Sequence, residues 1–312
     1  MTQRVLVAGG AGFVGRHVVA KLSAAGHDVV VLTRARERAR ELLLLPTVRV
    51  VEADPFDAAV LARWTHGASA VINLVGVLHE RGRETFERVH VEFPRMLVDA
   101  CRKAGASRIL HMSALAAAPD AASRYLRSKA AGEALVAGSG LAWTIFRPSV
   151  IFGRGDTFLS LFARLANAFP VIPLACANAR FQPVFVGDVA ECFSRALVDD
   201  ATVGRRYSLC GPKAYTLQEL VSYVAETSGH PRPIVALGPG VAQMQARVME
   251  WLPGPLLTRD NLASMQHDSV CEGPFPPEFG ITPAPVEAIA PEYLAPVALR
   301  SRFDTFRASS GR

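Results

Sequence analysis

A glycine-rich turn close to the start of the sequence restricts the fold more than any other feature of the chain. Residues 4–8 (RVLVA) are mostly apolar and typical of a buried strand, and Gly9, Gly12 and Gly15 follow them at three-residue intervals. From Val14 onward, apolar residues recur with the period of an amphipathic helix. The glycine turn therefore joins a strand to a helix.

A strand, a glycine turn and a helix in this order form the unit that binds the pyrophosphate of a dinucleotide. Gly9 makes the tight turn, Gly12 lets the backbone approach the pyrophosphate, and Gly15 lets the helix pack closely against the strand. Phe13 and Val14 open the helix, whose N–H groups point toward the phosphate. A turn that needs glycine only for steric reasons is the alternative, and its position between a strand and a helix favours the dinucleotide site.

The end of the second strand, expected over 27–32, decides between the two nicotinamide dinucleotides. In NAD-binding folds an acidic residue about 20 residues past the glycines binds the ribose hydroxyls. Thr33 stands there instead, and Arg34 and Arg36 follow. A guanidinium binds a 2′-phosphate that a carboxylate would repel. We therefore expect NADP(H) in preference to NAD(H), with Arg16 joining the phosphate site. A solvated helix start is the alternative for these arginines.

Strands and helices alternate through the first half of the chain. This alternation predicts an α/β fold with a doubly wound parallel Rossmann sheet. Further strands are expected at 48–54, 70–76, 108–113 and 142–146, and helices at 57–64, 86–103 and 123–133. Ligands bind at the carboxyl ends of parallel strands. Asp54, Val75 and Gly76 are therefore candidate walls of the adenine and ribose site, although Asp54 closing a turn and Gly76 relieving crowding are open alternatives.

A Tyr-x-x-x-Lys pair places Tyr125 and Lys129 one turn apart on the same face of an alanine-rich helix. Such pairs occur by chance on many surface helices. The order of the motifs strengthens this one, because the glycine turn comes first, Ser113 ends the fifth strand, and Pro148 follows the sixth strand. These residues are the candidate catalytic group and nicotinamide pocket.

In this order the motifs resemble those of the extended or atypical short-chain dehydrogenase/reductase superfamily. More narrowly, the chain is similar to the nucleotide-binding accessory subunit of respiratory complex I and its bacterial relatives. The segments that carry the narrower resemblance are 125–133, 147–153, 182–190 and 252–258. Ala8 departs from the superfamily pattern, which commonly has Thr before the glycines.

The resemblance implies a role for each member of the candidate catalytic group. Tyr125 is then the general acid and base beside the nicotinamide, with a pKa lowered from about 10 by Lys129 and the cationic nicotinamide. Lys129 also binds the nicotinamide ribose, Ser113 orients the substrate oxygen, and Pro148 shapes the nicotinamide pocket.

Two functions follow from this sequence. The first is an NADP-dependent oxidoreductase or epimerase that acts on a small or apolar carbonyl or hydroxyl substrate, and the intact Ser113, Tyr125 and Lys129 favour it. The second is a non-catalytic, NADP(H)-bound accessory or assembly protein of a respiratory NADH:quinone oxidoreductase. The narrower resemblance favours the second function, as does an apolar stripe at helical spacing formed by Met244, Val248, Trp251 and Leu252. Such stripes more often belong to a core.

Composition excludes several classes of protein. The chain has 312 residues, of which 50% are hydrophobic, so it can bury a sizeable core. Its net charge is +6, but the basic residues are scattered, and we expect no nucleic-acid partner. No apolar run approaches the roughly 20 residues of a membrane helix. The first strand starts almost at Met1, so we expect no signal peptide and a cytoplasmic protein, with peripheral association at the inner membrane under the second function.

The cysteines stand alone, without a C-x-x-C motif or a metal-ligand pairing with histidine. They are Cys101, Cys176, Cys192, Cys210 and Cys271. This dispersed, odd set argues against a disulfide framework and favours a reducing compartment. We also expect no metal site.

The remaining segments predict a second, smaller lobe. We assign residues 1–155 and 181–204 to the dinucleotide-binding domain, and residues 156–180 and 205–312 to a lobe for substrate or partner. Asp188 is expected to cap a helix over 189–197, and Thr216 with Glu219 forms a capping box. We expect the tail at 301–312 to fray.

Overall fold

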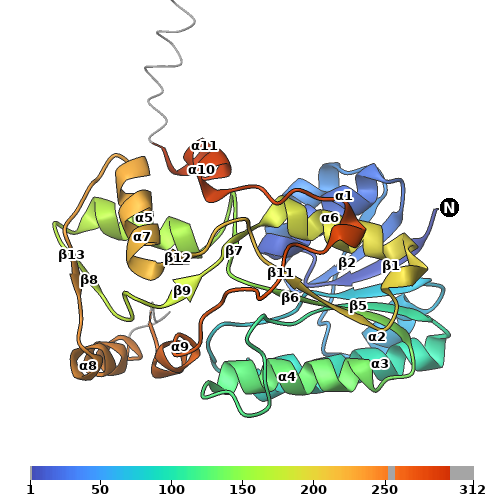
Figure 1. Cartoon of the computed structure of the whole chain (residues 1–312). Helices are drawn as coiled ribbons and strands as arrows, with labels where there is room; N and C mark the ends of the chain where they lie inside the picture. Colours follow the sequence, from blue (N-terminus) through green and yellow to red (C-terminus); the bar gives the residue numbers. More distant parts are fainter. Residues whose placement is uncertain (1, 252–256, 296–312) are drawn as a thin grey trace, which may run out of the picture.

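The fold is built on one seven-stranded parallel sheet (Figure 1). The computed structural model describes residues 2–251 and 257–295. The strands run in the order β11, β6, β5, β4, β1, β2, β3, and the predicted doubly wound Rossmann sheet is confirmed. Their bounds are β1 (Arg4–Ala8), β2 (Asp28–Thr33), β3 (Val48–Glu52), β4 (Ala70–Asn73), β5 (Arg108–Met112), β6 (Ala142–Pro148) and β11 (Arg205–Leu209).

Helices cover both faces of the sheet, so its central strands are buried on both sides. Helices α1 (Phe13–Ala24) and α6 (Val186–Val198) pack on one face. On the other face lie α2 (Ala58–Thr65), α3 (Phe93–Ala104) and α4 (Arg124–Ala137), which Figure 1 shows beneath the sheet. Along β1, Val5 and Val7 enter the first core, whereas Leu6 and Ala8 enter the second. Burying one Val or Leu side chain contributes about 1.5–3 kcal/mol.

The strand order reverses between β1 and β4, because β2 follows β1 on one side and β4 lies on the other. Ligands of doubly wound sheets bind at this switch point, outside the carboxyl ends of the strands. The glycine turn follows β1, and the segment from Leu74 to Gly76 follows β4. The fold therefore brings these two segments together at the predicted binding edge.

The second lobe has its own core, formed mainly between α5 (Phe158–Ala168) and α7 (Leu217–Thr227). The Thr216–Glu219 capping box is present at the start of α7. Three two-stranded sheets accompany this core: β7 (Ile151–Phe152) with β10 (Val184–Phe185), β8 (Ile172–Leu174) with β13 (Ile234–Ala236), and β9 (Arg180–Phe181) with β12 (Tyr215–Thr216). The remaining α-helices are α8 (Pro239–Met249), α9 (Arg259–Ser264), α10 (Val286–Ile289) and α11 (Pro291–Leu294).

Four short helical segments complete the described chain: η1 (Arg36–Leu44), η2 (Arg88–Glu92), η3 (Asp200–Thr202) and η4 (Pro277–Phe279). Within residues 2–251 and 257–295, no helix has the length and apolar character that crossing a membrane requires. Leu252 of the predicted stripe, most of the 252–258 segment and the tail at 301–312 lie outside the described residues.

The outer strand of the main sheet lies in a segment that the sequence analysis assigned to the second lobe. The sequence placed residues 205–312 in the second lobe, but β11 pairs in parallel with β6 and belongs to the main sheet. Arg108 of β5 holds the segment that leads into β11 against the main sheet. Its buried guanidinium donates to Ala196 O and to the hydroxyls of Thr144 and Thr202. Strand β11 is an edge strand with charged residues on its exposed positions, so its sequence does not resemble a buried strand.

The predicted cap at Asp188 is wrong. Helix α6 begins at Val186, three residues earlier than expected, so Asp188 lies inside its first turn. The Asp188 carboxylate instead accepts a hydrogen bond from Ala284 N at 2.8 Å. It thus ties the segment before α10 to the Rossmann domain, and a negative charge in the first turn still favours the helix dipole.

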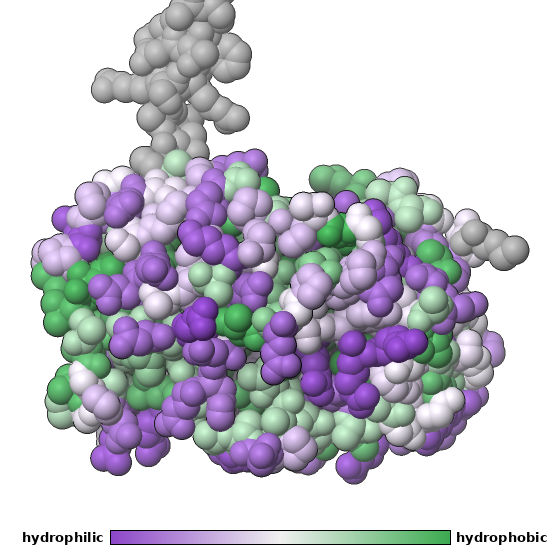
Figure 2. Space-filling view, in the orientation of Figure 1, coloured by the Kyte–Doolittle hydropathy of each residue, from purple (hydrophilic) through white to green (hydrophobic). Residues whose placement is uncertain are grey.

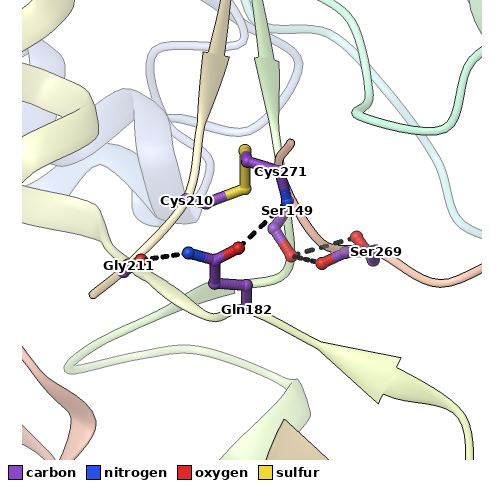
Figure 3. The surroundings of a disulfide bond; sticks show 6 residues. All are labelled: Ser149, Gln182, Cys210, Gly211, Ser269 and Cys271. Carbon is purple, nitrogen blue, oxygen red and sulfur yellow. Dashed lines mark hydrogen bonds between the residues drawn. A yellow bond between two sulfur atoms is a disulfide. The ribbon is translucent and has the colours of Figure 1, made fainter. Parts of the chain in front are cut away.

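A disulfide joins Cys210 to Cys271, with Cα atoms 6.1 Å apart, contrary to the expectation from the sequence (Figure 3). Gln182 lies between the two segments that the disulfide connects. Its amide nitrogen donates to Gly211 O, and its amide oxygen accepts from Cys271 N at 3.0 Å. The argument from the cysteines for a reducing compartment therefore does not hold for this pair.

We predict that Cys271→Ser lowers the free energy of unfolding by up to about 4 kcal/mol, because the bond closes a loop with a sequence separation of 61 residues. Urea unfolding of wild type with and without dithiothreitol measures the same loss. Dithiothreitol should leave the Cys271→Ser variant unchanged, which is the control. Five free thiols in unreduced, denatured wild type would contradict the disulfide.

Candidate functional site

The turn after β1 admits no side chain at its first and third glycines. Gly9 has a φ of +82°, and a Cβ atom there would lie 2.8 Å from the carbonyl carbon of Leu74. A Cβ atom at Gly15 would lie 2.2 Å from Gly9 O. Real atoms do not approach so closely, so α1 packs against the turn only because both residues lack a side chain.

The N-terminus of α1 is open to an anion. Gly12 is the N-cap residue, and no side chain caps the helix. The first turn carries no acidic residue, and its N–H groups at Phe13 and Val14 belong to the part of a helix that has no acceptor within the helix itself. This end of a helix favours a phosphate through its N–H groups and its dipole. The residues present therefore fit the pyrophosphate of a dinucleotide.

The predicted 2′-phosphate residues have different partners in the structure. Arg34 forms an ion pair with Glu84, which comes from the segment after β4. Arg16 pairs with Glu41 at 3.5 Å. The Thr33 hydroxyl donates to Ala35 O at 3.0 Å and thereby closes the turn after β2. Arg34 is thus held beside the end of β2, next to an acidic residue that the sequence analysis did not consider.

Three further predicted residues are also placed by local contacts. Arg36 begins η1 and lines an open surface depression with Asp28 and residues 46–50, along the outer strand β3. Asp54 is exposed and accepts a hydrogen bond from Phe56 N at 3.0 Å, which is the turn-closing role considered as its alternative. Val75 N donates to the side chain of Asn73 at 3.1 Å.

Gly76 lies beside the candidate catalytic group. A Cβ atom there would lie 3.6 Å from His90 Nε2 and 3.9 Å from Lys129 Nζ. The segment after β4 therefore passes close to the Lys129 ammonium group. This position brings Gly76 close to the candidate catalytic group, a contact that the sequence did not predict, and its role as a wall of the adenine and ribose site stays a prediction.

Lys129 and Ser113 meet at the carboxyl end of β5. Lys129 is 4% exposed, and its ammonium group donates to the carbonyl oxygen of Met112 at 2.6 Å. Ser113 follows Met112 and is 3% exposed. Its hydroxyl lies toward the Glu133 carboxylate and contributes to the low pKa of that group, but it forms no well-aligned hydrogen bond within the described residues. A buried hydroxyl held this weakly is available to a ligand.

Tyr125 lies one helical turn before Lys129, and its ring packs edge-on against Phe86 and His90. Burial raises the pKa of Tyr125 to about 12 and lowers the pKa of Lys129 to about 8. Desolvation therefore opposes the lowering of the Tyr125 pKa that is expected from Lys129 and the cationic nicotinamide. Near neutral pH Tyr125 holds its proton and Lys129 is charged.

Pro148 is buried at the end of β6, where its carbonyl accepts from Leu115 N at 3.1 Å. The preceding residue, Arg147, forms a bidentate ion pair with Glu133, which is 2% exposed. Arg206 of β11 binds the same carboxylate at 2.6 Å. The pKa of Glu133 is lowered although burial opposes this, so a fixed negative charge lies one turn beyond Lys129 and raises the pKa of that lysine.

Sequence reasoning missed His90, which connects three parts of the site. His90 Nε2 accepts from Val77 N at 3.1 Å, so the proton resides on Nδ1, which lies 2.8 Å from the Ser128 hydroxyl. The Ser128 hydroxyl donates to Tyr125 O at 2.7 Å. Burial, with Lys129 nearby, lowers the pKa of His90 to about 2. The neutral ring thus links the segment after β4 to the helix turn that carries Tyr125.

His111 on β5 is a second buried histidine near Lys129, and its Nδ1 lies 3.1 Å from the Asn73 amide nitrogen. Burial lowers its pKa to about 3, and Lys129 adds to this effect. Neither histidine had a motif that could reveal it. The one local signal is that His90 lies in a π-helical segment, η2, because such bulges frequently mark functional sites.

The second lobe caps the helix that carries Tyr125. Asp260 of α9 accepts from the backbone N–H groups of Arg124 and Tyr125, at 2.6 Å and 3.0 Å, and from the Ser123 hydroxyl at 3.0 Å. Ser123 is the N-cap residue of α4. The position of Tyr125 therefore depends on α9 as well as on the Rossmann domain.

A family model matches this arrangement over most of the Rossmann domain. Residues 5–210 match the model described as the NAD dependent epimerase/dehydratase family. The chain belongs to this family. It is accordingly a protein that binds a nicotinamide dinucleotide, and the resemblance stated from the motifs is confirmed.

Proteins to which the chain is similar include a subunit of mitochondrial NADH dehydrogenase and a bacterial reductase. The chain is 36% identical over 224 residues to the mitochondrial NADH dehydrogenase [ubiquinone] 1 alpha subcomplex subunit 9 of Mus musculus, a match that covers 70% of this chain and 59% of the mouse protein. It is also 34% identical over 256 residues to the ceramide reductase of Caulobacter vibrioides, with 79% and 78% of the two chains covered.

A solved structure shares the fold. The dTDP-glucose 4,6-dehydratase DesIV of Streptomyces venezuelae, determined with NAD and TYD bound, is 25% identical and superposes with a TM-score of 0.65. The superposition covers 76% of this chain and 85% of DesIV. Family membership thus supports a dinucleotide at the glycine turn, and it leaves the substrate and the choice between NAD and NADP to the residues of this chain.

Proposed function

We propose that the protein is an NADP(H)-dependent oxidoreductase that reduces an apolar carbonyl substrate or oxidises the corresponding alcohol. One observation carries this proposal: Lys129, one helical turn after Tyr125, meets the buried Ser113 at the carboxyl end of β5, and the Ser113 hydroxyl forms no well-aligned hydrogen bond within the described residues. A purely structural serine at this depth would be expected to make a hydrogen bond. The ceramide reductase relative supports an apolar substrate.

The residues of the site fit the reductive direction. NADPH bound at the glycine turn supplies a hydride to the carbonyl carbon. Tyr125, with a pKa raised to about 12, holds the proton that the carbonyl oxygen needs, and Ser113 orients that oxygen. The Lys129 ammonium group stabilises the negative charge left on Tyr125 and binds the nicotinamide ribose. Hydride and proton together convert a ketone into an alcohol. An epimerase would use the same proton transfer in both directions.

The preference for NADP(H) rests on Arg34. No carboxylate stands directly at the end of β2, and Arg34 presents a guanidinium there, half exposed and paired with Glu84. A 2′-phosphate has more charge than a carboxylate and accepts paired hydrogen bonds from a guanidinium. The phosphate therefore replaces Glu84 as the partner of Arg34. The acidic residue that the sequence analysis overlooked weakens NADPH binding but does not prevent it.

We predict that wild type binds NADPH more tightly than NADH, and that Arg34→Ala lowers NADPH affinity roughly tenfold to a hundredfold, as the loss of a charged hydrogen bond implies. Glu84→Gln should raise the affinity for NADPH and leave the affinity for NADH unchanged, because the substitution releases Arg34 from its ion pair. Calorimetric titration of both nucleotides measures these effects. Arg38→Ala, an exposed arginine in the same segment, is the control. Equal affinities in wild type, or a preference that survives Arg34→Ala, would contradict the proposal.

We predict that Tyr125→Phe abolishes turnover and spares nucleotide binding, because it removes only the transferable proton. Lys129→Ala should damage both, since it loses the ribose contact and the positive charge. Ser113→Ala should lower kcat by a factor on the order of 10²–10³, as the removal of one oxyanion donor does. Stopped-flow nicotinamide absorbance with ketones, quinones and nucleotide sugars measures turnover.

Tyr223→Phe, a partly buried tyrosine of α7 in the second lobe, is the matched control and should keep wild-type activity. Turnover by Tyr125→Phe comparable to wild type would remove Tyr125 from the mechanism.

The second candidate function is a non-catalytic, NADP(H)-bound accessory or assembly protein of a respiratory NADH:quinone oxidoreductase. The mouse relative favours it, and so does the apolar stripe on α8, which is exposed and not part of a core. Such a protein can keep Ser113, Tyr125 and Lys129 as a cradle for the nucleotide without turning over a substrate. Absence of turnover by wild type with every substrate of the panel, together with copurification with the complex from native membranes, would favour this candidate.

A further inference from the structure

Helix α8 presents an apolar face that no described residue covers. Its other face is buried, because Ala242 and Ala246 pack against Leu262 of α9. The uncovered residues lie three or four positions apart and share one side of the helix. They are Val241 (50% exposed), Met244 (62%), Val248 (65%) and, directly after the helix, Trp251 (91%). An exposed tryptophan in such a row is unusual for a surface that meets only water.

The apolar surface continues onto the small sheet that precedes α8. Strand β13 leads into α8 and pairs with β8, and Val235, Val171 and Phe169 are exposed on or next to these strands. We call these residues, with the four of α8, the apolar edge. Figure 2 shows apolar residues in green along the left side of the molecule, where Figure 1 places β8, β13 and α8.

The segments that form the apolar edge contain a single acidic residue, Glu250, which precedes Trp251 and is paired with Arg259. Residues 157–187 and 227–249 hold no Asp or Glu, although the chain has 28 in 312 residues and about five would be expected in segments of this length. Their charged side chains are Arg164, Arg180, Arg232 and Arg247. The edge is therefore apolar with an excess of cations around it, which makes it complementary to an apolar interface that carries negative charge.

We propose that the apolar edge docks on a lipid bilayer that contains anionic headgroups. The apolar face of α8 lies in the boundary between headgroups and acyl chains, with Trp251 at the depth that tryptophan favours. Arg247 and Arg164, both exposed, contact the lipid phosphates. The row projects from the surface of a helix. A bilayer needs no groove, whereas an amphipathic helical peptide docks in one.

The proposed membrane surface is mechanically connected to the catalytic helix. Helix α9 packs beneath α8, and Asp260 of α9 caps the helix that carries Tyr125. Docking through α8 thus holds the Tyr125 end of the site near the lipid phase, where apolar substrates reside. The inference goes beyond the proposed function, because docking needs no turnover and is compatible with either candidate.

Flotation of the full-length, nucleotide-loaded protein with vesicles tests the proposal. We predict binding to vesicles of phosphatidylcholine mixed with phosphatidylglycerol, and weaker binding to phosphatidylcholine alone. Val248→Ser and Trp251→Ser should each lower the partition coefficient roughly tenfold, because each removes one buried apolar side chain from the lipid. Arg247→Gln should lower the partition coefficient about fivefold on the anionic vesicles and change it little on the neutral ones.

Leu44→Ser is the matched control, because Leu44 is 86% exposed on η1, outside the apolar edge, and this variant should bind as wild type does. All substituted side chains are exposed, and unchanged thermal unfolding verifies the fold. Absence of wild-type flotation on both vesicles would overturn the proposal. So would binding that Val248→Ser and Trp251→Ser leave intact, or a dimer without lipid that these substitutions dissociate, since a second copy would then cover the edge. Nucleotide titration of the same variants keeps this test separate from the proposed function.

Discussion

The close approach of α1 to the turn after β1 is the constraint on which the site depends. A single methyl group at Gly15 would lie 2.2 Å from Gly9 O, so the helix can reach this position only with glycine. Because a Cβ atom at Gly9 would lie 2.8 Å from the carbonyl carbon of Leu74, the same turn also fixes where Leu74 and Val75 pass. The N-terminus of α1, the sheet's switch point and the Lys129 ammonium group are consequently placed around one edge of the sheet. A dinucleotide that extends along this edge connects the glycine turn with the catalytic helix.

Burial decides the protonation states at the other end of the site. Desolvation raises the pKa of Tyr125 to about 12 and lowers those of Lys129, His90 and His111, to about 8, about 2 and about 3. Both histidines are thus neutral and contribute hydrogen bonds that hold neighbouring segments together. Of these four side chains, Lys129 carries the positive charge. Glu133, held by Arg147 and Arg206, partly offsets the loss of charge on Lys129. This distribution of protons suits the transfer of a proton from Tyr125 to a substrate oxygen.

The sequence predicted the parts of the fold that local patterns determine. Buried parallel strands such as β1 and β2 are continuous apolar runs, and the glycine turn is specified by spacing alone. Strand β11 was missed, because an edge strand with Arg205 and Arg206 lacks that pattern. The disulfide between Cys210 and Cys271 was missed because partners 61 residues apart meet only through the tertiary fold. His90 and the Arg34–Glu84 pair were invisible for the same reason. The stripe on α8 was visible, but its exposure depends on which face α9 covers.

The central claim is that a nicotinamide dinucleotide extends from the glycine turn to Tyr125 and Lys129. A crystal structure of the protein with NADPH tests it most directly. The account predicts the pyrophosphate at the N–H groups of Phe13 and Val14, and nicotinamide ribose hydroxyls within hydrogen-bonding distance of Tyr125 Oη and Lys129 Nζ. A dinucleotide bound away from the glycine turn, or one whose nicotinamide ribose contacts neither Tyr125 nor Lys129, would contradict the account.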